Sequence, residues 1–345
     1  MKKVLIIGTG GTIVAEAGEN GLEPRPASPA LKRFLDELRG TEYDIDYIDL
    51  LNLDSSNIQS EEWQLIAENV YREIDNYDGI IITHGTDTMA YTASMLSFMI
   101  QNPGKCIVLT GSQIPLTNPL SDARINLATA LAAISANLPG VYVAFNRRII
   151  RGCRAVKVRT LGIDAFESVN AHYVGEMLAD GLHIYDHGVR TAAQLSGGNP
   201  VKGDSKSSIV FKPDVNDHVF LLKLIPSTNP EIFDAIFHLR YRGIVIEAFG
   251  AGGLHFIRRD LAKRIKSLVE NGVAVVICSQ CLYERSDISI YEVGRKIMSL
   301  GVIPGLDMTT EAAVTKLMWA LGQTSDLEEI RRIFGTNIAG EITIE

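Results

Sequence analysis

A threonine follows the first apolar run of this sequence in a setting that could support catalysis. The segment GTGGTI, residues 8–13, comes directly after KVLII and places Thr12 behind a Gly-Gly pair. A glycine turn at the carboxyl end of a strand presents the next side chain at the edge where open α/β sheets bind ligands. A threonine hydroxyl becomes a nucleophile when a neighbouring group removes its proton. The alternative is that the Thr12 hydroxyl only satisfies backbone groups of the turn.

The same construction occurs again in GIIITHGTDTM, residues 79–89, where a glycine turn is followed by Thr86 and Asp87. The next stretch is small or apolar on nearly every side, which is typical of a buried helix. Thr86 and Asp87 could simply cap that helix, because a hydroxyl and a carboxylate both stabilise a helix N-terminus. If both glycine turns lie at one sheet edge, however, two hydroxyls and a carboxylate converge there. This convergence would form a catalytic site.

The first glycine segment does not fit a dinucleotide-binding fold. That fold requires G-x-G-x-x-G at the start of a helix, and Ile13 stands at the last glycine position. The following residues, VAEAGENGLEPRPASP, are interrupted by glycine and proline and predict a loop, so a phosphate would find no helix N-terminus. The sequence also contains no G-K-[ST] phosphate loop and no G-x-S-x-G elbow. We therefore expect no nucleotide cofactor.

Apolar runs alternate with amphipathic stretches through the first half of the chain. KCIVLT and GVYVAF predict strands, and SEEWQLIAENVYREI predicts a helix with Ser60 as its N-cap. Repeated strand–helix units predict an α/β fold. We expect a larger N-terminal, mostly parallel sheet with helices on both faces.

The length of 345 residues favours two domains. Residues 191–218 are rich in Gly, Ser, Pro and Lys and show little periodicity, which predicts a linker. A shorter series of strand and helix patterns follows. We predict an N-terminal α/β domain over residues 1–190, which carries both threonine segments, and a smaller C-terminal α/β domain over residues 219–345.

The net charge and composition of the sequence limit the classes of partner that we expect for it. The chain has 33 Lys and Arg against 41 Asp and Glu, a net charge of −8 at pH 7, so we expect neither nucleic acid nor an anionic membrane as a partner. The basic cluster RRIIRGCRAVKVR, residues 147–159, lacks interleaved aromatic side chains and is interpreted mostly as a solvated edge. No apolar run is long enough for a membrane span or a signal peptide. We expect a cytoplasmic protein.

Histidine and cysteine spacing does not predict a metal site. The seven histidines show no H-E-x-x-H or other paired ligand spacing. Cys278 and Cys281 form one C-x-x-C at the end of an apolar run, without a second pair, and are interpreted as reduced thiols of the core. We therefore expect no metal. His84 is expected to brace the turn before Thr86.

The threonine segments also carry a family resemblance. TGGTI and HGTDTM, in this order and spacing, resemble the signatures of the bacterial-type L-asparaginases, and TGSQIPL is similar to the cytoplasmic type I branch. The resemblance extends over essentially the whole chain, through LDSSN, AVKVRT, DAFES and LDMTTEAAVTKL. It departs at Val14, where the first signature usually has a small residue.

The resemblance implies hydrolysis of the side-chain amide of L-asparagine to L-aspartate and ammonia through an acyl-enzyme, without a cofactor. By position, it implies Thr12 as the nucleophile and Thr86, Asp87 and Lys157 as a proton relay. A lysine accepts a proton only where burial or nearby cations favour its neutral form, and arginines surround Lys157 in the sequence. The alternation VKVR is by itself typical of a half-exposed strand, which would place Lys157 at the surface.

The resemblance further implies a substrate pocket formed by Gly11, Asp54, Ser55, Thr86, Asp87 and Ser112. In this pocket Asp54 and Asp87 correspond to partners of the substrate ammonium group, and Ser55 to a partner of its α-carboxylate. Without the resemblance, NLDSSN would be interpreted as an ordinary turn after a strand. Glutamine is expected to be a poorer substrate, because one added methylene displaces the amide from the attacking hydroxyl.

One position departs from the resemblance in a way that matters for chemistry. Many relatives place a lid tyrosine beside the first threonine, whereas Leu22 stands at that position here. Either another group, with Glu19 as the nearest polar candidate, polarises Thr12, or the lid only excludes water.

Two other functions remain open. The first is the ammonia-producing subunit of a tRNA-dependent amidotransferase, although such subunits have an additional N-terminal domain and the acidic charge suits tRNA poorly. The second is an amino-acid sensor that binds its ligand without turnover, because a fold does not determine a function. The resemblance also implies a homodimer or a homotetramer.

Overall fold

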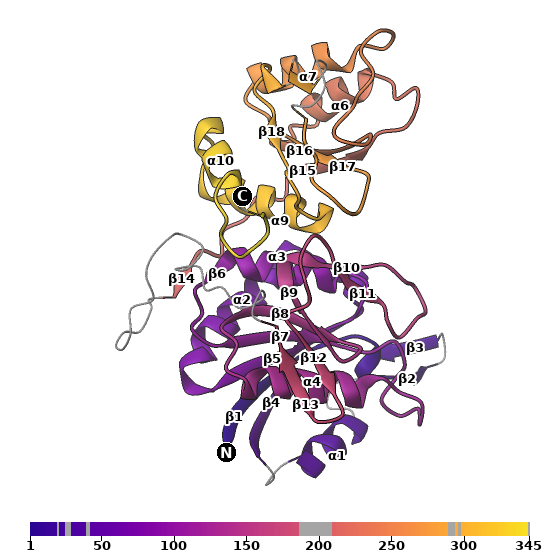
Figure 1. The fold of residues 1–345 in the computed structure, drawn as a ribbon, viewed down its shortest axis with the longest axis vertical. Coiled ribbons are helices and arrows are strands. Elements are labelled where there is room, and N and C mark those ends of the chain that lie inside the picture. The colour runs from indigo at the N-terminus through magenta and orange to yellow at the C-terminus, as the bar shows by residue number, and fades with distance from the viewer. Residues whose placement is uncertain are drawn as a thin grey trace. The chain divides into compact units, whose positions relative to one another are not determined.

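The computed structural model describes residues 1–18, 21–24, 29–38, 42–185, 209–288, 294–295 and 298–343, with only the backbone for 16–18 and 21–24. The chain divides into two compact units, Met1–Pro213 and Asp214–Glu345 (Figure 1). Most of the predicted linker, residues 191–218, lies outside the described residues, and so does Glu19. Each unit is considered separately below.

An eight-stranded sheet forms the centre of the N-terminal unit. Its strand order is β13-β12-β9-β8-β7-β5-β1-β4. The strands are β1 (Lys2–Gly10), β4 (Tyr43–Leu53), β5 (Gly79–Thr83), β7 (Cys106–Thr110), β8 (Gly140–Phe145), β9 (Arg148–Arg151), β12 (Gly175–Leu178) and β13 (Gly181–Ile184). The five strands from β8 to β4 are parallel, and β9, β12 and β13 are antiparallel. The prediction of an α/β fold with a mostly parallel sheet is confirmed.

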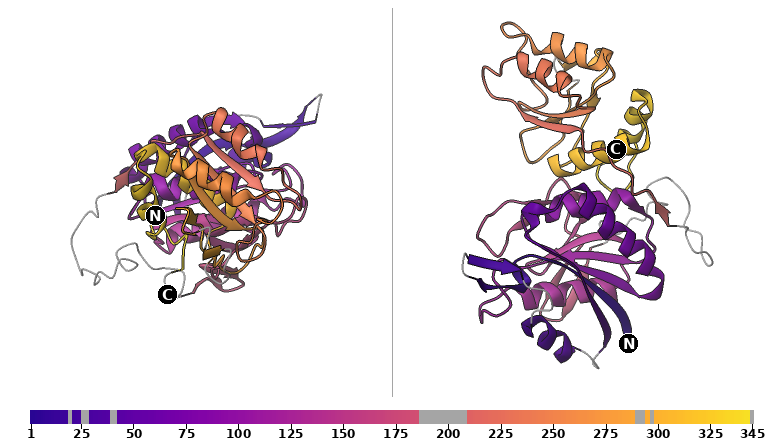
Figure 2. Two further views of the ribbon diagram at one scale, coloured as in Figure 1. Left: turned by 90° about the horizontal axis from the view of Figure 1, so that it is seen from above. Right: turned by 180° about the vertical axis from the view of Figure 1, so that it is seen from behind.

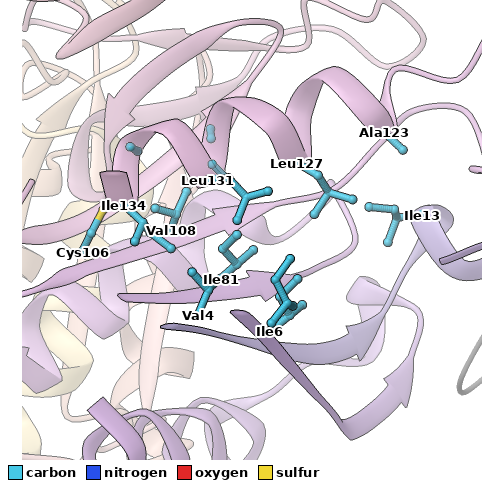
Figure 3. Close-up of a cluster of buried hydrophobic side chains, with 14 of the residues drawn as sticks. Val4, Ile6, Ile13, Ile81, Cys106, Val108, Ala123, Leu127, Leu131 and Ile134 are labelled. Carbon is cyan, nitrogen blue, oxygen red and sulfur yellow. The ribbon is translucent and has the colours of Figure 1, made fainter. Parts of the chain in front are cut away.

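Helices cover both faces of this sheet. Figure 1 shows α2 and α3 on one side of the strands and α1 and α4 on the other. These helices are α1 (Pro29–Leu38), α2 (Ser60–Glu73), α3 (Met89–Met99) and α4 (Ala123–Ser135). Val4, Ile6, Ile81 and Val108 pack with Leu127 of α4 in one buried cluster (Figure 3). Since side chains alternate along a strand, the buried neighbours of these residues face the opposite helices.

Helices α2 and α3 show how well sequence patterns locate these elements. Every residue of α3 except Tyr91 is buried, as its apolar character predicts. The predicted N-cap of α2 is wrong by one residue, because Ser60 is already helical and Gln59 precedes the helix. The carboxylate of Glu62 accepts a hydrogen bond from the backbone N–H of Gln59 (2.8 Å), which starts the helix there.

The segment after GTGGTI is more ordered than the predicted loop. A 3₁₀ turn (Thr12–Val14) is followed by an antiparallel hairpin of β2 (Ala15–Gly18) and β3 (Gly21–Pro24). Glycine and proline stand at the ends of these strands, but strands this short carry no recognisable alternation. Leu22 lies opposite Ala17 in this hairpin.

Two further strand pairs complete the N-terminal unit. They are the antiparallel pair β10 (Ala155–Lys157) and β11 (Phe166–Ser168), and the antiparallel pair β6 (Ile100–Gln101) and β14 (Val210–Phe211). The first pair carries Lys157 at the end of β10.

The C-terminal unit is a smaller α/β unit, also visible in Figure 2. Its sheet contains the parallel strands β15 (Val219–Lys223), β16 (Gly243–Ala248), β17 (Ala274–Ser279) and β18 (Ile303–Pro304). Residues of α6 (Glu231–His238) and α7 (Leu261–Glu270) share one buried cluster with these strands. The unit ends with α9 (Thr310–Gln323), which contacts β15, β16 and β17, and with α10 (Leu327–Phe334).

One interpretation of the sequence needs correction, and another has an exception. Cys278 is buried, but Cys281 is exposed, because β17 ends at Ser279 and the chain leaves the sheet before the second thiol. The basic cluster is predicted to be mostly a solvated edge, and Arg154 is the exception within it, because it is only 1% exposed. Among the helices of the described residues, none combines the length and the apolar character needed to cross a membrane.

Candidate active site

Three turns meet at the carboxyl ends of the neighbouring strands β5, β1 and β4. The backbone N–H of Gly11 donates to the carbonyl of Leu53 (3.1 Å). A Cβ atom on Gly11 would lie 2.5 Å from the backbone nitrogen of Gly85, and one on Gly85 would lie 2.7 Å from Ser55 Oγ. The turns can approach this closely only because glycine stands at both positions. The sheet therefore brings together the segments that carry Thr12, Thr86 and Ser55.

Thr12 is placed by the residues on either side of it. Gly11 adopts φ 80°, a left-handed conformation that turns the chain sharply at the strand end. Ile13 is 1% exposed and packs into the same cluster as Ala123 and Leu127 (Figure 3). Thr12 itself is partly exposed, and its hydroxyl has no hydrogen-bond partner among the described residues. Its side chain is thus accessible on a well-anchored backbone.

Thr86, Lys157 and Asp87 form a continuous hydrogen-bonded chain. Lys157 Nζ donates to Thr86 Oγ1 (2.8 Å) and to Asp87 Oδ1 (2.6 Å). Thr86 is 6% exposed, and the side chain of Lys157 is 15% exposed. The strand pattern alone would have placed Lys157 at the surface, and that interpretation is wrong because β10 packs against α3.

Ser55 and Asp54 lie beside this chain. Ser55 is buried, its Oγ accepts from the backbone N–H of Asp87 (3.3 Å), and its carbonyl accepts from Thr88 Oγ1 (2.7 Å). Asp54 Oδ1 accepts from the hydroxyl and the backbone N–H of Ser56. These two hydrogen bonds lower the pKa of Asp54 although burial opposes them. Asp54 is exposed and remains an ionised carboxylate at the rim of the site.

Ser112 and Gln113 follow β7. Ser112 is buried, and its hydroxyl donates to the carbonyl of Ile114 (2.7 Å), so its side chain stabilises its own turn. Thr86 Oγ1 donates to Gln113 Oε1 (3.0 Å). Gln113 Nε2 donates to two backbone carbonyls, those of Thr160 (3.0 Å) and Gly162 (3.2 Å).

Two buried polar residues on α4 and just before it support the Gln113 turn, and the sequence did not identify them. Asp122 accepts from the backbone N–H groups of Gln113 (3.1 Å) and Ile114 (3.0 Å). Asn126 donates to Asp122 Oδ2 (3.0 Å) and to the carbonyl of Gly111 (2.9 Å). The available signal was Asn126 itself, a polar side chain between the apolar Ile125 and Leu127, which is costly to bury without partners. Gln113 carries no comparable signal.

His84 is fully buried behind the second turn. Its Nδ1 lies 2.7 Å from the carbonyl of Gly85, and its Nε2 lies 2.9 Å from Thr92 Oγ1, which also accepts from Trp63 Nε1 (3.0 Å). The carbonyl of Gly85 can only accept, so Nδ1 carries the ring proton and donates it to Gly85. In the neutral ring Nε2 is then an acceptor, and the Thr92 hydroxyl donates to it. Burial lowers the pKa of His84 to about 4, which keeps the ring neutral. This network supports the predicted role of His84 as a brace.

Two family models match the chain. The model of the asparaginase N-terminal domain matches residues 3–190, and the model of the glutaminase/asparaginase C-terminal domain matches residues 218–334. The chain therefore belongs to the asparaginase family. The resemblance carried by TGGTI and HGTDTM is confirmed. Among the described residues, no group of three or more His, Cys, Asp or Glu side chains could hold a metal ion.

Individual relatives agree with the family models. The chain is 43% identical to the L-asparaginase of Thermococcus kodakarensis, with 99% of both chains covered. A solved structure of the thermostable L-asparaginase from that organism superimposes with a TM-score of 0.89 at 42% identity, covering 99% of this chain and all of the other. L-asparaginase 1 of Escherichia coli is 34% identical over 99% of this chain and 98% of its own length. A glutamyl-tRNA(Gln) amidotransferase subunit of Metallosphaera sedula is 36% identical over 98% of this chain and 76% of its own length.

Proposed function

We propose that the chain is an L-asparaginase, which hydrolyses the side-chain amide of L-asparagine to L-aspartate and ammonia. The observation that carries this proposal is the Thr86–Lys157–Asp87 chain beside the contact of Gly11 with Gly85. That contact supports a site in which the accessible Thr12 lies near Thr86, which is hydrogen-bonded to Lys157. The full-length similarity to asparaginases supports the same reaction.

In the proposed reaction, Thr12 Oγ1 attacks the amide carbon of the substrate side chain. The Thr12 proton passes to Thr86, while Thr86 gives its own proton to neutral Lys157. Backbone N–H groups of the glycine turns stabilise the tetrahedral oxyanion. The C–N bond then breaks, ammonia leaves with a proton returned through the relay, and an ester on Thr12 remains. Water hydrolyses this ester by the reverse proton path, which releases aspartate and restores the hydroxyl.

The proposed substrate site lies around the same turns. The exposed carboxylates of Asp54 and Asp87 would bind the α-ammonium group, and the hydroxyl of Ser55 would donate to the α-carboxylate. The backbone around Gly11 and Ser112 would complete the pocket. Because these groups fix the amino-acid end, the length of the substrate decides whether its amide reaches Thr12.

The test is ammonia and aspartate release by the purified chain alone, with L-asparagine and L-glutamine compared in the presence and absence of a chelator. We expect turnover of asparagine that survives the chelator, and a kcat/KM for glutamine lower by at least about 10-fold, because one methylene displaces the amide. Ammonia release that requires a partner subunit and tRNA would indicate an amidotransferase subunit and would overturn the proposal. Binding of asparagine without ammonia release would indicate a sensor and would overturn it as well.

Assembly and location belong to the same proposal. We expect a homodimer or homotetramer without nucleic acid, and light scattering of the active protein measures this directly. None of the four cysteines, Cys106, Cys153, Cys278 and Cys281, forms a disulfide in the described part of the chain, which suits the reducing cytoplasm. A fully active monomer would contradict the proposed assembly.

A further inference from the structure

Gln113 is fixed from both ends. Its backbone N–H donates to the two carboxylate oxygens of Asp122, at 3.1 Å each, and Asp122 is only 6% exposed. Its side-chain nitrogen donates to the carbonyls of Thr160 (3.0 Å) and Gly162 (3.2 Å), in the loop that follows Lys157. Two carbonyl oxygens can only accept, so the NH₂ end of the amide must face them. The orientation of the amide is therefore determined by its surroundings.

This orientation also determines where the Thr86 proton points. Gln113 Oε1 must face Thr86, and it lies 3.0 Å from Thr86 Oγ1. An amide oxygen cannot donate, so the hydroxyl proton of Thr86 is directed at Gln113. Lys157 Nζ occupies one lone pair of the same hydroxyl at 2.8 Å. The Thr86 oxygen is thus held between one donor and one acceptor.

We propose that Gln113 is a positioning residue of the proton relay, which holds the Thr86 proton whenever Lys157 is charged. This inference rests on the proposed function. When Lys157 is neutral, the Thr86 hydroxyl turns its proton from Gln113 Oε1 to Lys157 Nζ and can then accept the proton of the attacking group. After the transfer, the proton newly bound to Thr86 points to Gln113 again. No bond to Gln113 forms or breaks, and Gln113 does not touch the substrate.

Replacing Gln113 by methionine keeps the length of the side chain and removes both the acceptor and the donors. We expect Gln113→Met to lower kcat for asparagine by about 10-fold or more and to change KM by less than about 3-fold, because the relay and not substrate binding is disturbed. The matched control is Gln101→Met. In the unmodified protein Gln101 Nε2 donates to the carbonyl of Phe98 (3.0 Å), away from the site. Unchanged kcat in Gln113→Met, or an increase in KM alone, would overturn the inference.

A double-mutant cycle separates this role from simple anchoring of the 160–162 loop. In a Thr86→Val background no hydroxyl remains to be positioned, so Gln113→Met should cause no further loss of kcat. An equal loss in both backgrounds would show that Gln113 acts through the loop and would overturn the inference.

A crystal structure of Gln113→Met tests the same geometry without turnover. We expect the Thr86 side chain to rotate away from its position in the unmodified protein or to lose its 2.8 Å contact with Lys157. An unchanged Thr86 and Lys157 would overturn the positioning role. Absence of ammonia release from the unmodified protein would instead contradict the proposed function, and the crystal structure would still decide the role of Gln113.

Discussion

At the residue scale, the two threonines of the site differ in what surrounds their hydroxyl groups. Thr86 is buried and hydrogen-bonded to Lys157 and Gln113, so its oxygen is confined. Thr12 is partly exposed and has no hydrogen-bond partner among the residues that the structure describes. A confined hydroxyl is suited to passing protons, and an accessible one to attacking a substrate.

The first prediction concerns this division of roles. Thr86→Val preserves the shape of the side chain but removes the hydroxyl that would pass the Thr12 proton to Lys157 in the proposed relay. We expect kcat for asparagine to fall by about 1,000-fold, because members of a nucleophilic relay fail together. The matched control is Thr129→Val. In the unmodified protein the Thr129 hydroxyl donates to the carbonyl of Ile125 within α4 (2.7 Å), away from the site. Steady-state ammonia release from both variants checks this, and comparable rates would contradict it.

The second prediction is a pH dependence of stability that arises from His84. Its pKa is about 4 in the fold because of burial, against 6.5 as the ordinary value. Between these pH values only the unfolded chain takes up the proton, so stability is complete above pH 6.5 and falls as the pH approaches 4. Over this range the free energy of unfolding falls by about 3 kcal/mol. Urea unfolding at pH 7 and pH 4.5 should show a smaller loss for His84→Gln than for the unmodified protein, and equal losses would refute this.

The residues of the site differ in how well the sequence predicts them. Thr12, Thr86 and Asp87 follow apolar runs and glycines, which is a local pattern. Lys157 needed the family resemblance, because strand alternation alone placed it at the surface. Gln113 stands in the segment TGSQIPL, but its role could not be predicted, since its partners Thr160 and Gly162 lie 47 and 49 residues away along the chain.

At the element scale, the site depends on turns that are packed against one another. The carboxyl ends of parallel strands lie at one edge, and the glycines at these ends let the backbones come into contact. The sequence predicts the strands well because their apolar runs are continuous. It does not predict the β2–β3 hairpin, whose strands have four residues each, or the antiparallel strands at the far edge of the large sheet. Register between distant segments has no local signal.

The third prediction tests the contact between turns. In Gly85→Ala the new Cβ would lie 2.7 Å from both Cβ and Oγ of Ser55, so one of the two turns must move. We expect kcat/KM to fall by about 100-fold, because a displacement near 1 Å is enough to misalign reacting groups. In the control Gly335→Ala the nearest atoms are 3.7 Å away, and activity should not change. An active Gly85→Ala would show that the turns tolerate separation.

At the scale of the whole molecule, the C-terminal unit contains a fully buried ion pair that fixes the end of the chain. Lys316 of α9 pairs with Glu341 (2.6 Å), and both side chains are 0% exposed. Lys316 also donates to the carbonyl of Thr336 (2.8 Å), and Glu341 accepts from the backbone of Ile338 and Ala339. All charges of this cluster are therefore hydrogen-bonded, as burial requires.

The fourth prediction follows from that pair. Lys316→Met leaves the carboxylate of Glu341 buried without its cation and should lower the free energy of unfolding by about 3–5 kcal/mol. Lys266→Met, which removes an exposed pair with Glu270, should cost less than about 1 kcal/mol. Denaturant unfolding of both variants at neutral pH compares them. A Lys316→Met variant as stable as the Lys266→Met control would contradict the prediction.

The pair of Lys316 and Glu341 also makes the stability of the fold depend on pH. Burial alone would raise the pKa of Glu341, but the charge of Lys316 and the hydrogen bonds lower it below the ordinary value. The contribution of Glu341 to stability is thus complete above the ordinary pKa of a glutamate. It is lost as the pH falls through the lower pKa that Glu341 has in the folded protein. Lys316→Met should therefore narrow the difference in stability between neutral and acidic solution.

The central claim is that an accessible threonine at the first glycine turn attacks the amide of asparagine. It is tested most directly by ammonia release from L-asparagine for the unmodified protein, Thr12→Ser and Thr12→Ala under identical conditions. We predict a measurable rate for Thr12→Ser, which keeps a hydroxyl, and a kcat at least about 1,000-fold below the unmodified protein for Thr12→Ala. A Thr12→Ala variant that turns over asparagine at the rate of the unmodified protein would contradict the account.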